Sequence, residues 1–372
     1  MEVATDTYQL LGLMSGSSLD GLDIAHCRFI LDAQKRIQSW ELTKATTIPF
    51  TEEWKATLLS LPEYSAKSLL SAHAAFGQYL GQIARDFLDA HQLSVQAIAS
   101  HGHTIFHFPN QNFTFQLGDG AQIAALTGCT TISDFRAMDI AQGGQGAPVA
   151  PIADHLLLPG YDFYLNLGGI ANISAPLIDR IVAFDISGAN QVLNALSQIE
   201  GLAYDDGGKL AASGQLLPTL YEQANQLAFF KDDYPKSLGN DWVQERQLKL
   251  YLEYDASISD RLHTACHQIA FQIANSIQQI IRKEQLHQKK YNMIVSGGGA
   301  WNRFLIASIK EACKPFTSLE IVIPKEEIIN YKEAILMALM GVLRLTKQPN
   351  CYASVTGAQK DSIGGAIHFI SQ

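Results

Sequence analysis

The segment GLMSGSSLDGLD at residues 12–23 lies between two apolar runs, residues 8–14 and 22–30. These runs predict two strands joined by a tight turn, because glycine, serine and aspartate tolerate positive φ or bond their own backbone. Such a turn directs backbone N–H groups and small hydroxyls toward one point, which suits a phosphate. It is not a Walker A loop, since no Gly-Lys-Ser/Thr follows and no helix is expected behind it. Taken alone, the cluster is more typical of an ordinary hairpin.

The same pattern occurs a second time. Residues 161–166 and 173–177 read as strands around a glycine turn at 167–172. This duplication predicts an α/β fold of two similar lobes, with one phosphate loop in each lobe and a nucleotide in the cleft between them. We expect an N-terminal lobe at 1–160 and a C-terminal lobe at 161–372, with the C-terminal helix able to pack back on the first lobe.

The composition favours a cytoplasmic protein without nucleic-acid or membrane partners. The chain has 372 residues, of which 47% are hydrophobic and 17% charged, enough for two sizeable cores. A net charge of -9 argues against non-specific binding to nucleic acid or acidic membranes. The longest apolar stretch, residues 334–343, is too short to span a bilayer, and the N-terminus lacks the basic region of a secretory signal. Five dispersed cysteines predict buried free thiols in a reducing compartment.

Polar residues follow several expected strands, where ligands of α/β sheets usually bind. His101 and His103 come after the strand at 95–100, and either could line a pocket or be structural. Arg136 stands between two aspartates and could clamp a carboxylate or a sugar hydroxyl, or simply pair with Asp134. The glycine-rich run at 142–148 could equally be a plain linker.

Three further sites can be interpreted either as functional or as purely structural. Asp185 follows the strand at 181–184 and precedes a helix at 191–199, so it could cap that helix, but we favour a general base facing the cleft. The glycines at 297–299 lie between a strand and a helix and would let backbone approach a flat ring. Glu333 opens an apolar helix, which is favourable with the helix dipole alone.

Nine motifs along nearly the whole chain match one family. They are GLMSGSSLDGLD (12–23), SHGHTIFHFP (100–109), QLGDG (116–120), SDFRAMDIAQGGQGAPVAP (133–151), NLGGIANIS (166–174), AFDISGAN (183–190), SGGGAWN (296–302), the Glu333–Ala334 helix start and SVTGA (354–358). The sequence resembles the anhydro-N-acetylmuramic acid kinases, a branch of the sugar kinase, actin and heat-shock chaperone ATPase superfamily. The resemblance implies two lobes of a duplicated ribonuclease-H-like fold with a nucleotide cleft between them.

The resemblance also implies a reaction and a set of site residues. The family opens the 1,6-anhydro ring of its sugar with water and transfers the ATP γ-phosphoryl group to O6, using Mg²⁺, in peptidoglycan recycling. Asp185 matches the base that activates water. The implied ATP contacts are Gly16, Ser17, Ser18, Leu19, Asp20, Gly21, Leu22, Asp23, Gly168, Gly169, Asn172, Gly297, Gly298, Gly299 and Asn302. The implied sugar contacts are Thr104, Arg136, Asn190 and Glu333, and Asp20 would hold Mg²⁺ directly or through water. The family also implies a homodimer.

The sequence departs from the family pattern in three loops. Asp-Thr-Gly-Pro-Gly-Asn becomes DISGAN at 185–190, His-Gly-Gln-Thr becomes HGHT at 101–104, and Lys-Ser-Thr-Gly-Arg-Glu becomes KSLGND at 236–241. Two alternatives therefore stay open at this point. The chain could act on another 1,6-anhydrosugar such as levoglucosan, or it could be a nucleotide-binding regulatory protein that has lost phosphoryl transfer.

Overall fold

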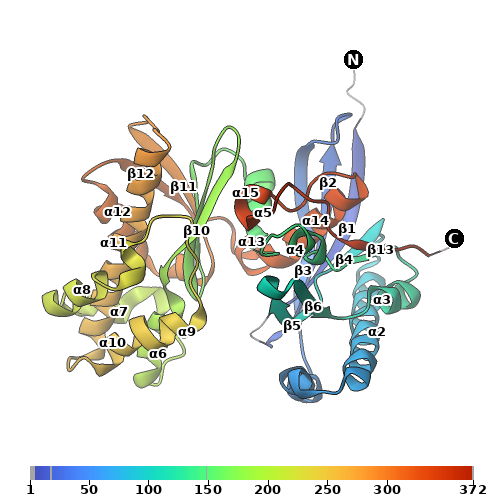
Figure 1. Ribbon diagram of the computed structural model, residues 1–372, viewed down its shortest axis with the longest axis horizontal. Coiled ribbons are helices and arrows are strands. Elements are labelled where there is room, and N and C mark those ends of the chain that lie inside the picture. Colours follow the sequence, from blue (N-terminus) through green and yellow to red (C-terminus); the bar gives the residue numbers. More distant parts are fainter. Residues whose placement is uncertain (1–4, 17–18, 148, 371–372) are drawn as a thin grey trace. The chain divides into compact units, whose positions relative to one another are not determined.

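The computed structural model describes residues 5–16, 19–147 and 149–370, and the chain divides into two compact units (Figure 1). Unit 1 comprises Met1–Pro159 and Tyr331–Gln372, and unit 2 comprises Gly160–Asn330. The expected division assigned residues 331–372 to the second lobe. These residues belong to unit 1 instead, because helix α14 (Lys332–Leu345) packs against strands β1, β2 and β4.

Unit 1 is built on a six-stranded sheet with the order β13-β7-β4-β1-β2-β3. Strands β1 (Asp6–Ser15), β2 (Gly21–Leu31) and β3 (Ile37–Pro49) form an antiparallel meander, and the apolar runs on both sides of the turn predict the first two of them. Strands β4 (Ala97–Ser100) and β7 (Thr131–Ser133) continue the sheet parallel to β1, and β13 (Ala366–His368) closes it antiparallel to β7. The glycine-bearing helix expected at the C-terminus is therefore a short strand.

Both faces of this sheet are covered. Leu10 of β1 packs in the cluster that contains α14, whereas Leu11 and Leu13 pack in the cluster that contains α2. Successive side chains of a strand point to opposite faces, so one strand serves both cores. Apolar residues at helical spacing over 65–91 predict one long helix, and this is α2 (Ala66–His91). The N-cap of α2 is Ser65, whose side chain accepts the N–H of Ser68 at 3.2 Å.

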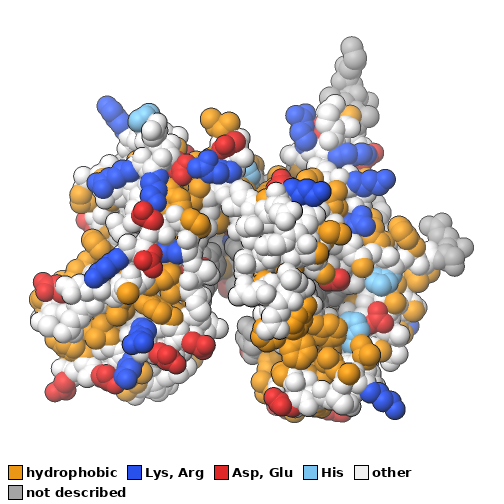
Figure 2. All heavy atoms as spheres, viewed as in Figure 1, with side chains coloured by type: hydrophobic (Ala, Val, Ile, Leu, Met, Phe, Trp, Pro, Cys, Tyr) orange, Lys and Arg blue, Asp and Glu red, His pale blue; other side chains and the backbone are white. Residues whose placement is uncertain are grey.

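The remaining elements of unit 1 surround this sheet (Figure 1). They are α1 (Glu52–Ser60), η1 (Leu61–Glu63), β5 (His103–Phe108), η2 (Pro109–Gln111), β6 (Phe113–Leu117), α3 (Gly120–Thr127), α4 (Ala137–Ala141), α5 (Ala150–Leu157) and α15 (Ala353–Thr356). Strands β5 and β6 form a separate antiparallel hairpin. Figure 2 shows apolar side chains gathered over this hairpin, to which the exposed Phe108 and Phe113 belong.

Unit 2 repeats the topology of unit 1. Its sheet has the order β10-β9-β8-β11-β12. Strands β8 (Phe163–Leu167), β9 (Ile170–Pro176) and β10 (Ile181–Gly188) form the antiparallel meander. Strands β11 (Lys290–Ser296) and β12 (Ser318–Val322) extend it in parallel on the other side of β8. In both units, then, the first strand lies between the second and the fourth strand of the repeat.

The core of unit 2 forms around α11 (Ile258–Lys283), a helix with buried residues along its whole length. The other elements are α6 (Asn190–Ile199), η3 (Asp206–Gly208), α7 (Lys209–Ser213), α8 (Pro218–Asn225), η4 (Ala228–Lys231), α9 (Asn240–Trp242), the π-helical η5 (Val243–Leu248), α10 (Lys249–Glu253), η6 (Gly298–Trp301), α12 (Arg303–Cys313) and α13 (Glu326–Asn330). Two expected boundaries shift here. The turn after β8 is only Gly168–Gly169, and β10 extends four residues beyond Phe184.

Two composition-based expectations can be compared with the structure. Across the described ranges, no helix combines the length and apolarity needed to cross a membrane. All five cysteines are free thiols; four are buried and Cys129 is half-buried.

Candidate functional site

In unit 2, the two glycine turns expected to hold a nucleotide lie against each other. Strands β8 and β11 are parallel neighbours, so the turns that follow them meet at the same sheet edge. A Cβ atom on Gly297 would lie 2.7 Å from the Leu167 carbonyl, and Gly297 has a φ of 81°, so glycine is required there. Asn190 lies against both turns: its side-chain amide donates to the Leu167 carbonyl at 3.0 Å, and a Cβ atom on Gly299 would lie 3.0 Å from its Oδ1.

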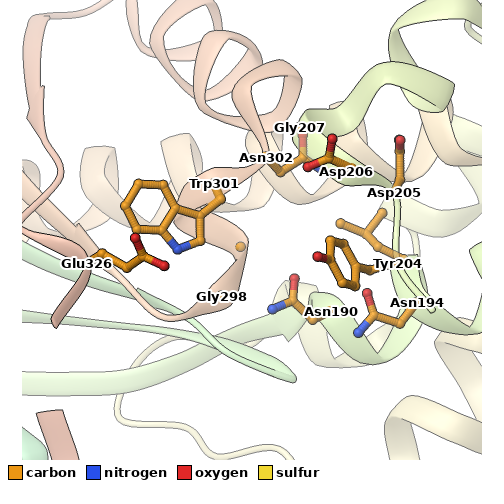
Figure 3. A pocket seen from close by; sticks show the side chains of 12 residues that line it. Asn190, Asn194, Tyr204, Asp205, Asp206, Gly207, Gly298, Trp301, Asn302 and Glu326 are labelled. Atoms are coloured by element: carbon orange, nitrogen blue, oxygen red, sulfur yellow. The ribbon is translucent and has the colours of Figure 1, made fainter. Parts of the chain in front are cut away.

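A cavity of about 500 Å³ opens beside these turns (Figure 3). Its lining residues are Asn190, Leu193, Asn194, Tyr204, Asp205, Asp206, Gly207, Gly298, Gly299, Trp301, Asn302 and Glu326. Figure 3 shows Trp301 and Tyr204 on opposite sides of the cavity, with Gly298 between them. Aromatic side chains and amide groups around a cavity of this size suit a small planar ligand with polar edges.

Four expected contacts lie on this wall: Asn190, Gly298, Gly299 and Asn302. Asn302 also begins α12, where its side chain accepts the N–H of Leu305 at 2.9 Å. The resemblance assigned Asn190 to the sugar, but the structure places it on the wall of this cavity.

The sequence reading missed several other residues that line this cavity. Tyr204, Asp205, Asp206 and Gly207 form a loop that precedes α7, and both carboxylate oxygens of Asp205 accept N–H groups of that helix, at 2.8 Å each. The run YDDGG was recognised only as a loop. Its two consecutive glycines, both with positive φ, were the available sign of a tight, special turn.

Asp185 lies within β10 and does not cap α6. The strand continues to Gly188, and the residue preceding α6 is Ala189. A register shift between Asp185 and Ser187 marks a bulge, and bulges often re-aim a side chain beside a functional site. The helix-cap interpretation is therefore excluded.

The buried side chain of Gln247 provides hydrogen-bond partners for the residues at this bulge. Its carbonyl accepts the N–H of Gly188 at 2.9 Å, and its amide donates to Ser187 Oγ at 2.9 Å and to the Gly188 carbonyl at 3.2 Å. A Cβ atom on Gly188 would lie 2.5 Å from Val243. The altered residues after Asp185 are thus buried and hydrogen-bonded within the core of unit 2.

A row of polar residues crosses the sheet at Asp185. Asp185 is the cross-strand partner of Asn172, which in turn is the partner of Asn166. Directly paired residues share one face of the sheet and have Cβ atoms about 5 Å apart. Asn166, which the sequence reading did not select, therefore joins Asn172 and Asp185 in one row.

In unit 1, the expected phosphate segment lies between β1 and β2. Ser17 and Ser18 lie outside the described residues. Leu19 has a φ of 60° and its N–H contacts the Gly16 carbonyl at 3.4 Å, as expected for a tight turn. Gly21 already belongs to β2, and Leu22 is 1% exposed in the core. The Leu22 side chain is thus turned into the core, so a phosphate contact at this residue would have to come from its backbone.

Charged groups gather near this turn. Burial raises the pKa of Asp23, a hydrogen bond from Thr47 at 2.5 Å opposes that rise, and the negative charge of Asp20 adds to it. Burial also raises the pKa of Glu333, in the first turn of α14, and the charge of Asp23 adds to that rise while Arg136 opposes it. Asp20, Asp23, Glu333 and Arg136 therefore act on one another electrostatically, although they are far apart in the sequence.

Arg136 is held by a histidine and forms no ion pair with Asp134 among the described residues. Its Nε donates to Nε2 of buried His101 at 3.0 Å, while Nδ1 of His101 lies 2.9 Å from the Gly102 carbonyl. The simplest tautomer has the proton on Nδ1, so that Nε2 accepts. Burial, helped by the Arg136 charge, lowers the pKa of His101 to about 3. His101 is therefore neutral and fixes the guanidinium.

Thr104 and His103 begin the β5–β6 hairpin. Thr104 is half-buried, and its hydroxyl accepts from Gln116 at 3.4 Å. His103 is buried, with Nδ1 at 2.9 Å from Ser15 Oγ at the end of β1. The altered residue of the HGHT motif thus bonds directly to the strand that precedes the first phosphate turn.

The glycine-rich run after Arg136 is anchored, so it is not a plain linker. Buried Asp139 accepts the N–H of Gly146 at 2.8 Å and the hydroxyl of Thr356 at 2.7 Å. The N–H of Gln145 donates to the Thr356 carbonyl at 2.9 Å. These bonds join the run to the SVTGA segment, so two motifs that are far apart in the sequence lie in contact.

Neutral His101 predicts a pH-dependent stability. Its pKa falls from 6.5 in the unfolded chain to about 3 in the folded one, so the unfolded state binds more protons below pH 6.5. Stability is therefore complete above pH 6.5 and falls as the pH is lowered. Between pH 7 and 5 we expect this histidine to account for a loss on the order of 2 kcal/mol.

Urea unfolding at both pH values, in the unchanged chain and in His101→Gln, measures this contribution. Glutamine cannot take up the proton, so the variant should lose less stability between pH 7 and 5. Identical losses in both proteins would contradict the assignment.

The repeated strand order, with antiparallel strands one to three and parallel strands four and five in each unit, defines the duplicated ribonuclease-H-like fold of the sugar kinase and actin class. A family model described as anhydro-N-acetylmuramic acid kinase matches residues 8–370. The chain belongs to this family of sugar kinases.

Two relatives agree with this placement. The anhydro-N-acetylmuramic acid kinase of Coxiella burnetii is 34% identical over 96% of this chain and 97% of its own length. That of Hydrogenovibrio crunogenus is 32% identical over the same shares. Among solved structures, the activator of 2-hydroxyisocaproyl-CoA dehydratase from Clostridium difficile aligns with 91% of this chain and 97% of its own, at 12% identity and a TM-score of 0.38.

Proposed function

We propose that the chain is a hydrolysing kinase that converts anhydro-N-acetylmuramic acid, ATP and water to N-acetylmuramic acid 6-phosphate and ADP. The match of one family over residues 8–370 carries this proposal. In it, a water oxygen bonds to C1 of the sugar, and the C1–O6 bond breaks with its electron pair going to O6. O6 then bonds to the γ-phosphorus, and the bond to the bridging oxygen breaks to release ADP. The water proton passes to a carboxylate of the enzyme.

Asp185 is the carboxylate that we propose for this proton. It is half-buried in β10, beside the polar row with Asn172, and is positioned by a bulge. A base within reach of a bound water supports attack at C1 by removing charge as the new bond forms. We propose that Arg136, Glu333 and Thr104 of unit 1 contact the sugar, and His101 keeps the Arg136 guanidinium in one orientation.

The cavity of unit 2 is our proposed site for the nucleoside of ATP, with the Gly168–Gly169 turn near its phosphates. At the start of α6, the backbone N–H groups of Ala189, Asn190 and Gln191 already donate to the carbonyls of the Gly168–Gly169 turn, at 2.8 to 3.2 Å. Phosphate contacts would therefore come from the turn itself rather than from the start of this helix. The segment Gly16–Asp23 of unit 1 is the proposed second source of phosphate contacts.

The charges of the acidic residues near the first turn support the proposal of a bound Mg²⁺. The mutual repulsion that helps raise the pKa values of Asp23 and Glu333 is relieved by a cation, and Mg²⁺ usually takes one or two carboxylates together with substrate phosphates. Asp20 and Asp23 would hold it, directly or through water. When bound, it would neutralise charge on the phosphate oxygens during transfer.

We further propose that the enzyme works in the cytoplasm, in the recycling of peptidoglycan, as a homodimer. The family membership supports the pathway, and the homodimer is an extension from the same family. Size-exclusion chromatography with light scattering tests the homodimer directly: a monomer at working concentrations would overturn it.

The aromatic wall of the cavity gives a prediction for ATP. Trp301 is 43% exposed in the structure, and an aromatic contact with a nucleobase contributes about 0.5–1.5 kcal/mol. Trp301→Ala should therefore weaken ATP binding roughly three- to tenfold, as measured by isothermal titration calorimetry. Phe271, also 43% exposed but outside the cavity lining, is the matched control, so Phe271→Ala should leave the affinity unchanged. Equal affinities in the unchanged chain and Trp301→Ala would refute this placement of the nucleobase.

A coupled ATP-turnover assay with Mg²⁺ tests the proposed function. It compares anhydro-N-acetylmuramic acid, levoglucosan and no sugar. We expect turnover with the muramic sugar alone. Turnover with levoglucosan instead would move the function to another anhydrosugar, and ATP binding without any sugar-dependent turnover would favour a regulatory protein.

A further inference from the structure

The two carboxylate oxygens of Asp185 have different surroundings. Oδ2 accepts the backbone N–H of Leu238 at 2.8 Å and the hydroxyl of Ser237 at 3.0 Å. Within the ranges that the structure describes, no protein group donates to Oδ1. The two oxygens are therefore unequal before any substrate binds, and only one is free to accept a proton.

Both donors come from a loop that follows η4 and is tied to the strand of Asp185. The N–H of Asp185 donates to the Lys236 carbonyl at 3.1 Å, so backbone and side chain of the same residue bind consecutive loop residues. Tyr234 stacks on Phe184, with ring centroids 4.8 Å apart and planes 7° from parallel, and its hydroxyl donates to Glu284 at 2.8 Å. The loop thus contacts the backbone and the side chain of Asp185 and the ring of the residue before it.

The side chain of Lys236 also stabilises this loop, through hydrogen bonds to backbone carbonyls that precede it. Its Nζ donates to the carbonyls of Asp232 at 2.9 Å and Phe229 at 3.2 Å, and it lies 4.6 Å from the centre of the Phe229 ring. Leu238, where the family pattern has threonine, is buried in the core of unit 2 and contributes its backbone N–H rather than a side chain. Because the backbone N–H does not depend on which side chain residue 238 carries, the altered loop still donates a hydrogen bond to Asp185.

We propose that Ser237 and the Leu238 N–H hold Oδ2 of Asp185, so that Oδ1 is the oxygen that takes the proton of the attacking water. The inference rests on the proposed function and deepens it, with Ser237 as a positioning residue. Two donors on one oxygen stop the carboxylate from rotating and direct the second oxygen to one place. They also stabilise the ionised carboxylate, the form that a base requires.

The pH dependence of kcat/KM tests this role, because a residue that only supports the fold would not move it. Ser237→Ala removes one hydrogen bond to the ionised carboxylate. The pH at which the rate is half-maximal on the acidic side should then rise by about 0.5 to 1 unit, with kcat at neutral pH falling roughly tenfold. Ser237→Thr restores the hydroxyl and should restore the acidic limb.

Two further variants complete the test. Ser213 is the matched control, because it is an exposed serine of unit 2 whose hydroxyl donates to a backbone carbonyl, that of Leu210 at 2.8 Å, and Ser213→Ala should leave the profile unchanged. Lys236→Met leaves Ser237 intact but loosens its loop, and should move the acidic limb in the same direction. Ser237 is exposed, so its variants should fold, which thermal unfolding verifies.

The outcomes separate the inference from the proposed function. Sugar-dependent turnover by the unchanged chain is measured first, and its absence would overturn both. If the unchanged chain turns over and Ser237→Ala has the same pH profile of kcat/KM, the inference is overturned but the proposed function is not. An equal shift in Ser213→Ala, or a failure of Ser237→Thr to restore the acidic limb, would also overturn the inference.

Discussion

Replacing Asp185 with asparagine should lower sugar-dependent ATP turnover by about a thousandfold, within the 10²–10⁴ range of general-base catalysis. Asparagine keeps the shape of the side chain, and its carbonyl oxygen can still accept from Ser237 and Leu238. Its amide group then occupies the position of the free carboxylate oxygen, and an amide cannot take a proton from water. Steady-state turnover with saturating sugar measures the loss.

ATP binding provides the control for this variant. Asp185 is not among the residues that line the nucleoside cavity, so the ATP dissociation constant of Asp185→Asn should stay within about twofold, well under the tenfold that 1.4 kcal/mol represents. Unchanged turnover in Asp185→Asn would refute the general-base assignment. Loss of turnover together with ATP binding would indicate a structural role instead.

The largest effect on stability is expected at Gly12, in the middle of β1. A Cβ atom there would lie 1.9 Å from the Ala334 carbonyl oxygen and 2.8 Å from the Ala338 backbone nitrogen. Both atoms belong to the backbone of α14, which cannot rotate away as a side chain can. Because overpacking of a core costs about 1–3 kcal/mol and sometimes more, Gly12→Ala should lower the free energy of unfolding by about 3 kcal/mol or more.

A second glycine serves as the control for Gly12. Gly239 has a φ of −82° and no atom within 4 Å of its Cβ position, so Gly239→Ala should change stability by less than about 0.5 kcal/mol. Urea unfolding compares the two variants. Equal midpoints would show that α14 does not approach β1 as closely as described. The helix that Gly12 approaches also carries Glu333, one residue before Ala334, so Gly12→Ala should also impair sugar-dependent turnover.

The architecture was largely predictable because its signals are local. Apolar runs on each side of a glycine turn identify β1–β2 and β8–β9, and their repetition predicts the duplicated fold that the strand orders confirm. The apolar spacing of α2 and its N-terminal Ser65 predict that helix almost to the residue. Such patterns depend on neighbours within a few positions, which a single sequence contains.

The contacts that build the candidate site are not local. Ser237 reaches Asp185 from 52 positions away, and Thr356 reaches Asp139 from 217. Tyr204 and Trp301 line one cavity although they are far apart in the sequence, and neither was selected as a ligand contact. Leu22 shows a further limit of sequence motifs: the resemblance assigns a whole segment to phosphate without distinguishing backbone from side chain, and the side chain of Leu22 packs in the core.

The most direct test of the central claim is the mass of the sugar product after complete turnover with ATP. A hydrolysing kinase adds one phosphoryl group and one water to anhydro-N-acetylmuramic acid, with one ADP released for each sugar. Mass spectrometry of the product should show both additions together. A product that has gained the phosphoryl group without water, or water without the phosphoryl group, would contradict the account.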